Sequence, residues 1–434
     1  MIPQADADAP ASEGRFAGRR VLAIGTFDSF VKTAAIVGRL FEAEGASLQM
    51  VALAAANRQL SKRQLRNGGL DERLPVVTAD ALVGSRLFRD AEIVVAVVDG
   101  GRARELFLTL AAADLSAEPR RPLIAIASPG LVLDDHLAGF MDRAPADVLC
   151  FNTEGDRALY QAAAAEIGVD ATNAVVSGLL GLDRRPWSPP QGRPTITFFE
   201  QPVMPARRLQ RVHLLVGLVD LAKRFPEADV LVKLRHARGE VAHHAARFHL
   251  EDIARELSPA GGLPTNLGFT HEPAATLLDR TSLAVTVSST VAVEAMARGV
   301  PTRILSDFGV SEALGSAYFV GSGCFSPLAA LRPDMGVAVD PGWLAGSGAL
   351  AAPEPLLAQC AALLAGQAGL DAPLPLRPLT PAYGSRDWLR FALGEGGPAA
   401  VHAPHLLERP KKGLALVRAV ARRLARGRVA RPKR

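Results

Sequence analysis

Short runs of apolar, β-branched residues alternate along this chain with longer Ala- and Leu-rich segments of helical periodicity. From Arg20 onward we expect strands at Val21–Ile24, Leu48–Leu53, Ile93–Val98, Leu123–Ala127 and Val148–Phe151. After the proline-rich stretch Arg185–Pro194, a second series is expected at Thr195–Phe199, Val230–Leu234, Leu283–Val287 and Thr302–Leu305. Such alternation is typical of βαβ units, so the sequence predicts an α/β protein with two doubly wound parallel sheets.

The two series of strands predict two similar domains joined by a linker. The expected segments are a disordered N-terminus at 1–19, Rossmann-like domains at 20–184 and 193–365, an irregular crossover at 366–410 and a basic helical tail at 411–434. Ligands of such sheets bind beyond the carboxyl ends of the strands. Two facing domains would therefore grip a two-part substrate in one cleft.

Composition narrows the class of protein. Hydrophobic residues make up 49% of the 434 residues and charged residues 21%, as in a globular protein. Cys150, Cys324 and Cys360 lie far apart without a CxxC pair, which indicates neither a disulfide framework nor a zinc site. The N-terminus lacks the features of a signal peptide, and no apolar run reaches the length of a membrane span. We expect a cytoplasmic protein with no metal and no cofactor.

The net charge of +5 conceals an uneven distribution. Residues 411–434 hold ten Lys and Arg and no acid, so the remainder carries 39 basic and 44 acidic residues, a net of −5. This balance argues against a nucleic-acid groove in the fold itself. Leu414–Ala425 reads as a basic amphipathic helix, which would lie on an anionic membrane at the inner face. The alternative is a solvated basic tail.

The stretch at 283–301 joins a β-type run to a helical segment through three hydroxyl residues. The apolar run ends at Ser288, Ser289 and Thr290, and an Ala-rich segment follows until Gly299. Free N–H groups and the positive end of a helix dipole meet at such a junction, so it can hold a phosphate without a lysine. The alternative is that one hydroxyl only caps the helix.

Two cations emerge at the end of the strand expected at Val230–Leu234. Lys233 and Arg235 are two residues apart and therefore share a face. Partly buried cations at a strand end need an anion, and the phosphate of a sugar nucleotide would supply it. The alternative is a pair of edge charges that face solvent.

The first strand ends close to a second group of candidates. Asp28 is expected at the start of the first helix, where it serves either as the general base for an acceptor hydroxyl or as an N-cap. Ser29 and Lys32 follow it on the same helix. The turn lacks the spaced glycines of a dinucleotide fingerprint, which argues against NAD binding.

Three further features follow predicted strands. Gly130 lies in the turn after the fourth strand, where it either admits a ligand close to the backbone or belongs to a plain loop. Glu200 and Gln201 follow the strand at Thr195–Phe199. The arginines that come next either contact the donor or face solvent, and solvent is the expectation; they are Arg207, Arg208 and Arg211.

Glu294 and a histidine pair complete the candidates. Glu294 lies about one turn into the helix after the serine pair, where its carboxylate either binds a ribose hydroxyl or interacts with the helix dipole. His243 and His244 have no matching third ligand and are expected at the surface or behind the site.

Taken together, these motifs resemble the bacterial glycosyltransferase family DUF6716 over most of residues 20–345. More distantly, Ser288–Thr290 is similar to the paired-serine motif of GT-B capsule sialyltransferases and Kdo transferases, whose serines bind the phosphate of a CMP-sugar. Those enzymes carry a His-Pro pair where this chain has Lys233-Leu234-Arg235. The resemblance implies the GT-B fold, with two Rossmann-like domains facing a cleft, and Asp28 as the base.

The function expected is metal-independent transfer of a sugar from a nucleotide-activated donor to a cell-surface glycan or lipid-linked acceptor. Lys233, Arg235 and the helix after Ser288 would neutralise the departing phosphate. The alternatives are a sugar-nucleotide epimerase of the same fold and a non-catalytic binding or scaffold protein. The expected site comprises Asp28 as catalytic residue, Lys233, Arg235, Ser288, Ser289, Thr290 and Glu294 at the donor, and Ser29, Lys32, Gly130, Glu200 and Gln201 elsewhere in the cleft.

Overall fold

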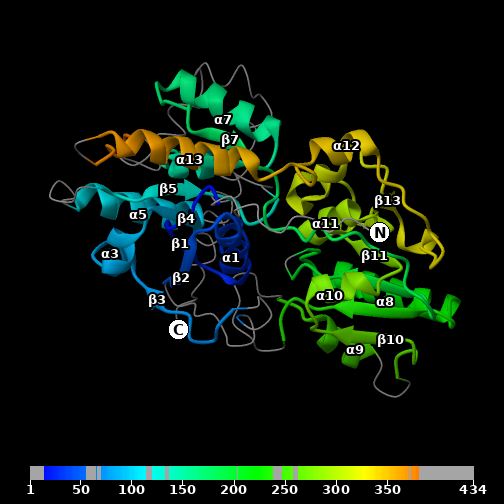
Figure 1. Ribbon diagram of the computed structural model, residues 1–434. Helices are drawn as coiled ribbons and strands as arrows, with labels where there is room; N and C mark the ends of the chain where they lie inside the picture. Colours follow the sequence, from blue (N-terminus) through cyan, green and yellow to red (C-terminus); the bar gives the residue numbers. More distant parts are fainter. Residues whose placement is uncertain are drawn as a thin grey trace, which may run out of the picture.

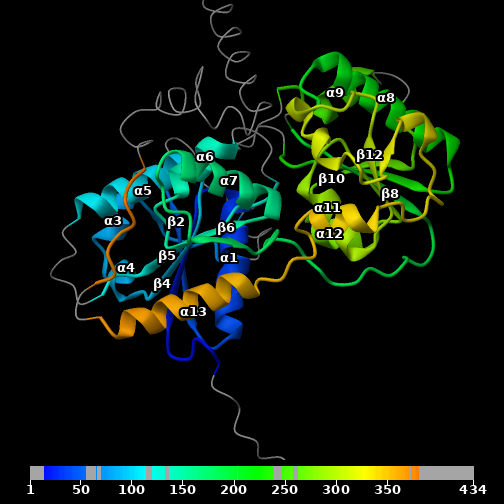
Figure 2. The ribbon, with the colours of Figure 1, turned by 90° about the horizontal axis from the view of Figure 1, so that it is seen from above.

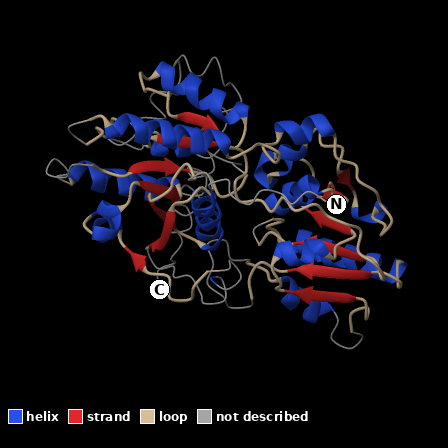
Figure 3. Ribbon diagram, viewed as in Figure 1, coloured by secondary structure: helices blue, strands red, loops and turns tan. Residues whose placement is uncertain are grey.

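Two parallel β-sheets, each flanked by helices, form the two halves of the molecule in the computed structural model (Figures 1 and 3). The structure describes residues 14–54, 65, 70–113, 120–131, 136–202, 204–237, 247–257, 262–370 and 373–380. The first sheet has the order β3-β2-β1-β4-β5-β6-β7, and the second has the order β10-β9-β8-β11-β12-β13. Every strand pair is parallel. Both sheets therefore follow the Rossmann order, and the molecule has the two-domain GT-B architecture.

The first domain alternates strands and helices. Its strands are β1 (Arg20–Gly25), β2 (Ser47–Leu53), β3 (Val76–Val77), β4 (Ile93–Val97), β5 (Leu123–Ile126), β6 (Val148–Phe151) and β7 (Ala174–Val176). Its helices are α1 (Asp28–Ala43), α3 (Ala79–Val83), α4 (Arg86–Asp90), α5 (Gly100–Ala112), α6 (His136–Arg143) and α7 (Glu154–Glu166). Strands β4, β5 and β6 are buried along their whole length because helices cover both faces of the sheet.

The second domain repeats the pattern. Its strands are β8 (Thr195–Phe199), β9 (Asp229–Lys233), β10 (Leu267–Thr270), β11 (Leu283–Thr286), β12 (Thr302–Leu305) and β13 (Phe325–Ser326). Its helices are α8 (Arg208–Arg224), α9 (Leu250–Leu257), α10 (Ala274–Asp279), α11 (Thr290–Arg298) and α12 (Pro341–Gly346). Short 3₁₀ turns lie at Glu312–Leu314, Ser316–Phe319 and Leu328–Ala330.

All nine strands expected from the hydrophobic pattern are present, with ends that differ by at most one residue. The pattern missed β3, β7, β10 and β13, which are strands of two to four residues at the sides of the sheets. Such short strands carry too few residues for a periodic signal, and their pairing depends on the neighbouring strand.

The last helix returns to the first domain. Helix α13 (Glu354–Ala368) buries Leu356, Cys360 and Leu364 in the same apolar core as β1, β4 and β5. Figure 2 shows α13 along the first domain, whereas the chain that leads to it comes from α12 of the second. The sequence-based boundary at residue 365 therefore comes too late, since the chain crosses back before α13.

Part of the N-terminal segment that was expected to be disordered packs against the first domain. Phe16 is 1% exposed, and its ring lies 4.9 Å from that of Phe41 on α1. Residues 14–19, which belong to the segment expected to be disordered, are therefore ordered. The basic tail at 411–434 lies outside the described residues. Among the helices that the structure describes, none combines the length and apolarity needed to cross a bilayer.

Two glycines meet where the chain passes between the domains. Gly178 and Gly348 both have positive φ, 72° and 74°, in the forward and return crossings. A Cβ on Gly178 would lie 2.4 Å from the Gly348 carbonyl oxygen, and a Cβ on Gly348 would lie 2.1 Å from the Asn152 carbonyl oxygen. Only glycine satisfies both the backbone conformation and this close approach.

Candidate active site at the domain junction

The topology defines where a ligand of each domain is expected. In a doubly wound sheet the strand order reverses at one point, which here lies between β1 and β4 and between β8 and β11. The carboxyl ends of β8 and β11 are tied together, because the Thr286 hydroxyl donates to the Phe199 carbonyl oxygen at 2.8 Å. Glu200 directly follows β8, and Ser288 stands two residues after the end of β11.

Helix α11 begins as the hydroxyl pattern predicts. Ser289 is the N-cap in extended conformation, and its Oγ accepts from the Val291 N–H at 3.3 Å. Gly299 ends the helix with φ of 89°. Ser288 is fully buried, and its hydroxyl oxygen has no hydrogen-bond partner within the described part of the chain. The capping alternative therefore holds for Ser289, whereas Ser288 is left with a buried polar group to satisfy.

Glu294 presents a second buried group without a partner. Its side chain lies one turn further along α11, is 6% exposed, and has an Oε1 with no hydrogen bond among the described residues. Burial raises the pKa of this carboxyl to about 7, although the Lys32 ammonium acts in the opposite direction. Lys32 belongs to α1, so candidate residues of the two domains share one electrostatic environment.

A direct contact joins the two domains at the start of α11. A Cβ on Gly130 would stand 2.7 Å from Thr290 Oγ1, and the same oxygen accepts from the Leu131 N–H at 3.4 Å. Gly130 is thus required by the close approach of Thr290 from the other domain. The side chain of Asn152, after β6, donates to the Gly130 carbonyl oxygen at 2.9 Å and holds this turn in place.

The predicted cations flank this region on β9, two strands from β11. Burial alternates along the strand, with Val230 and Val232 buried and Lys233 half-buried, while Arg235 is exposed beyond the strand end. The Glu200 N–H donates to the Lys233 carbonyl oxygen at 3.0 Å. The strand spacing places the β9 and β11 ends about 10 Å apart.

Glu200 is engaged by an arginine that we expected at the surface. Arg211 on α8 is 1% exposed and forms a buried ion pair with the Glu200 carboxylate. The same guanidinium donates to the Pro202 carbonyl oxygen at 3.2 Å. The expectation of a solvent-facing Arg211 was wrong, because its charge is needed to compensate a buried carboxylate. Glu200 and Arg211 together hold the loop that carries Gln201, whose buried Oε1 lacks a partner among the described residues.

In the first domain, α1 starts at Asp28 with Phe27 as the N-cap, so the alternative of Asp28 as cap does not hold. The Asp28 side chain lies outside the described residues, as do His243 and His244. Ser29 is half-buried. Thr26, which the sequence pattern did not single out, directly follows β1, whereas Ser288 stands two residues after β11, and the buried Thr26 Oγ1 also has no partner in the described chain. A hydroxyl residue within two positions of the end of a buried strand is the shared pattern that could have identified Thr26.

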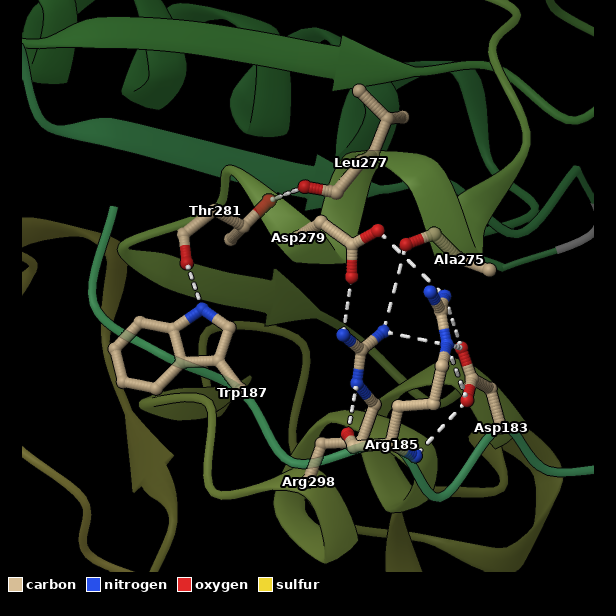
Figure 4. A network of polar contacts seen from close by, with 8 residues as sticks. All are labelled: Asp183, Arg185, Trp187, Ala275, Leu277, Asp279, Thr281 and Arg298. Carbon is tan, nitrogen blue, oxygen red and sulfur yellow. Dashed lines mark hydrogen bonds and ion pairs between the residues drawn. The ribbon is translucent and has the colours of Figure 1, made fainter. Parts of the chain in front are cut away.

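The linker between the domains is fixed to the far end of α11 (Figure 4). The buried Arg298 pairs with Asp279 and, at 3.5 Å, with Asp183, and its Nε donates to the Arg185 carbonyl oxygen at 3.0 Å. Trp187 adds a hydrogen bond from its indole N–H to the Thr281 carbonyl oxygen at 3.1 Å. One helix thus carries the proposed donor residues at its start and the linker attachment at its end.

A family model described as "Putative glycosyltransferase (DUF6716)" matches residues 21–363, which include both sheets and the whole junction. The chain belongs to the DUF6716 family. No curated protein matches its sequence. Within the described residues, no group of three His, Cys, Asp or Glu side chains is placed to hold a metal ion.

Solved structures with a similar arrangement include UDP-GlcNAc 2-epimerase from Methanocaldococcus jannaschii, with 12% identity, 76% of this chain and 97% of that chain covered, and a TM-score of 0.49. A UDP co-structure of MnaA from S. aureus has 11% identity, coverages of 86% and 96%, and a TM-score of 0.48. The glycotransferase of kitacinnamycin has 12% identity, coverages of 80% and 98%, and a TM-score of 0.41. The DUF6716 chain is similar to these proteins at a level that assigns no residue roles.

Proposed function

We propose that this DUF6716 protein transfers a sugar from a nucleotide-activated donor to a glycan or lipid-linked acceptor. The observation that carries the proposal is a pair of buried oxygen atoms that find no hydrogen-bond partner among the described residues, the Ser288 Oγ just before α11 and the Glu294 Oε1 on it. Leaving such groups unsatisfied costs about 1–3 kcal/mol each. A ligand with phosphate and hydroxyl groups satisfies both.

The donor phosphate is assigned to the start of α11. The first N–H groups of a helix have no partner within the helix, and the helix dipole adds positive potential there. Ser288, Ser289 and Thr290 lie at this end, and Lys233 and Arg235 supply formal charge from β9. These groups stabilise the negative charge that develops on the departing phosphate. Stabilisation of this charge is usually the largest contribution that a protein makes to the rate of such a reaction.

Glu294 is assigned to the ribose of the nucleotide. A carboxyl with a pKa of about 7 is present in both protonation states near neutrality, so it accepts or donates a hydrogen bond to a hydroxyl. Glu200 contributes indirectly, because its ion pair with Arg211 fixes the loop that follows β8. Gln201 lies on that loop, and its side-chain amide is assigned to the donor.

The acceptor is assigned to the first domain. Asp28 begins α1 next to β1, and Ser29 and Lys32 follow on the same helix. Asp28 is the proposed base that removes the proton of the acceptor hydroxyl, which then attacks the anomeric carbon as the nucleotide leaves. Gly130 brings the turn after β5 against Thr290 and so sets the distance between acceptor and donor groups.

A transfer assay with a panel of nucleotide sugars tests the proposal. We expect Lys233→Ala and Ser289→Ala to lower turnover at least tenfold while both proteins remain folded. Ser85→Ala is the matched control, because Ser85 caps α4 away from the junction in the same manner. It reproduces the loss of a cap, about 1 kcal/mol, without touching the donor residues.

Three outcomes would contradict the proposal. Full activity in both variants would remove the donor site, and a changed sugar nucleotide in the absence of acceptor would indicate an epimerase. Calorimetry that shows no affinity for CMP, UDP or GDP nucleotides would indicate a non-catalytic binding or scaffold protein.

For the location of the protein, we propose the cytoplasmic face of a membrane, with residues 411–434 as the attachment. Ten basic residues in this tail would each contribute about 1 kcal/mol near anionic lipid. In a flotation assay, the full chain should rise with vesicles that contain anionic lipid, whereas a chain that ends at residue 410 should not. Equal flotation of the two proteins would refute the attachment.

A further inference from the structure

Phe151 and Asn152, at the end of β6, contact both chain crossings between the domains. The Phe151 carbonyl oxygen accepts from the Ser177 N–H at 3.1 Å and from the Gly178 N–H at 3.2 Å, both in the forward crossing. In the return crossing, a Cβ on Gly348 would lie 2.1 Å from the Asn152 carbonyl oxygen. Because these contacts are close, a change in the path of either crossing displaces Asn152.

The Asn152 side chain connects this point to the turn after β5. Asn152 is 5% exposed, and its Nδ2 donates to the Gly130 carbonyl oxygen at 2.9 Å. That oxygen has no other hydrogen-bond donor within the described residues. Because the hydrogen bond is directional and its donor is buried, the position of the turn follows the position of Asn152.

The same turn makes the contact with the second domain. The Leu131 N–H donates to Thr290 Oγ1 at 3.4 Å, and a Cβ on Gly130 would stand 2.7 Å from that oxygen. The Leu131 side chain packs against an apolar cluster that includes Met296 of α11. Contacts therefore run without a break from the two chain crossings, through Asn152 and the turn, to the start of α11.

We propose that Asn152 is a positioning residue, which couples the geometry of the two crossings to the separation between the turn at Gly130 and the start of α11. Asn152 acts through the Gly130 carbonyl group and not on a ligand. Acceptor groups are assigned to the first domain and the donor phosphate to α11. This separation therefore sets how far the acceptor hydroxyl stands from the anomeric carbon, a consequence that rests on the proposed glycosyl transfer.

The distance between the domains in Asn152→Asp tests the coupling without any substrate. The substitution is nearly isosteric, and it replaces the N–H donor by an oxygen that repels the Gly130 carbonyl oxygen. Spin labels at Leu108→Cys on α5 and Leu209→Cys on α8 report the separation of the domains, because both positions are exposed and the three native cysteines are buried. We expect the distribution of label distances to become about twofold broader than in the labelled chain with Asn152 intact.

Asn173→Asp is the matched control. Asn173 is 1% exposed, and its Nδ2 donates to the Ala144 and Ala146 carbonyl oxygens at 3.0 and 2.8 Å. It precedes β7, whereas the forward crossing follows β7, so the variant loses the same kind of buried hydrogen bond away from the crossings. Its distance distribution should remain unchanged. Asn152→Ser removes the amide without adding a charge, and it should broaden the distribution even where the carboxylate of Asn152→Asp prevents folding.

In the transfer assay, a positioning role predicts a split between the two kinetic constants. Asn152→Asp should lower kcat about tenfold and leave KM for the nucleotide sugar within about twofold of wild type, because the donor residues on α11 and β9 keep their places. Asn173→Asp should leave both constants unchanged.

The outcomes separate the coupling from the proposed function. An unchanged distance distribution in the folded Asn152 variants would overturn the coupling, and so would an equal broadening in Asn173→Asp. A broadened distribution with an unchanged kcat would overturn the catalytic consequence alone. If the wild type turns over no nucleotide sugar, the proposed glycosyl transfer fails, whereas the label distances still decide whether Asn152 couples the crossings to the turn.

Discussion

Gly130 and Thr290 touch across the junction, and no room exists there for even one additional methyl group. The position of a Cβ on Gly130 is 2.7 Å from Thr290 Oγ1, well inside van der Waals contact. Gly130 lies in the turn after β5, and Thr290 is the first residue of α11. The distance between the two domains at the proposed site is therefore set by a glycine.

Gly130→Ala should weaken donor binding because the added methyl group pushes the start of α11 away from the first domain. We expect a five- to tenfold rise in the dissociation constant for the nucleotide donor, measured by calorimetry, equivalent to about 1 kcal/mol. Gly336→Ala is the control, since a Cβ there meets nothing within 4 Å. The double variant Gly130→Ala/Thr290→Ser keeps the hydroxyl assigned to the donor and frees its rotation, so it should recover affinity, and no recovery would argue against the contact.

Gly348→Ala should destabilise the protein more than a glycine substitution that introduces only backbone strain. Gly299→Ala provides the comparison, since Gly299 also has positive φ but has open space around it. Strain of this kind costs about 1–2 kcal/mol, and the contact with the Asn152 carbonyl oxygen adds to it in Gly348→Ala. Urea unfolding of both variants measures the difference. Equal losses of unfolding free energy in the two variants would show that the backbone around Gly348 rearranges to accept the added methyl group.

The buried Glu294 should make the stability of the protein depend on pH. Its folded-state pKa of about 7 lies above its ordinary value of 4.5, so the folded protein holds a proton that the unfolded chain releases. The contribution of Glu294 to the free energy of unfolding should be greatest below pH 4.5, and it should be lost as the pH rises through 7. The full effect is roughly 3 kcal/mol.

Glu294→Gln should remove this part of the pH dependence because the amide does not titrate. Denaturant unfolding between pH 5 and 8 measures it, with Glu354→Gln as a control at an exposed carboxylate. The Gln variant should be more stable than wild type at pH 8. Parallel pH profiles for wild type and Glu294→Gln would exclude a raised pKa.

Arg298→Met should loosen the linker while the rest of α11 stays folded. The substitution removes one of the two arginines that pair with both Asp183 and Asp279, the other being Arg185, and it removes the hydrogen bond to the Arg185 carbonyl oxygen. Because Asp279 is 46% exposed and Arg185 still pairs with both carboxylates, the loss should be about 1 kcal/mol. Limited proteolysis should cut the variant in the linker about fivefold faster than wild type. Arg255→Met, which removes an exposed ion pair on α9, should leave the rate unchanged.

Local sequence determined the elements of this fold. Apolar runs of four to seven residues predict strands because the order of apolar and polar residues within each run shows which of its faces are buried. Ser289 and Gly299 likewise define the ends of α11 through interactions within a few residues. The resemblance to DUF6716 rested on such local motifs, and the family match confirmed it.

The tertiary structure alone decided which of these motifs meet. Lys32 acts on Glu294 across the two domains, and Asn152 holds Gly130, although no spacing in the sequence relates these residues. The burial of Arg211 follows from the carboxylate that faces it. Such contacts depend on strand order and on chain crossings, which arise from packing over hundreds of residues and leave no periodic signal in the sequence.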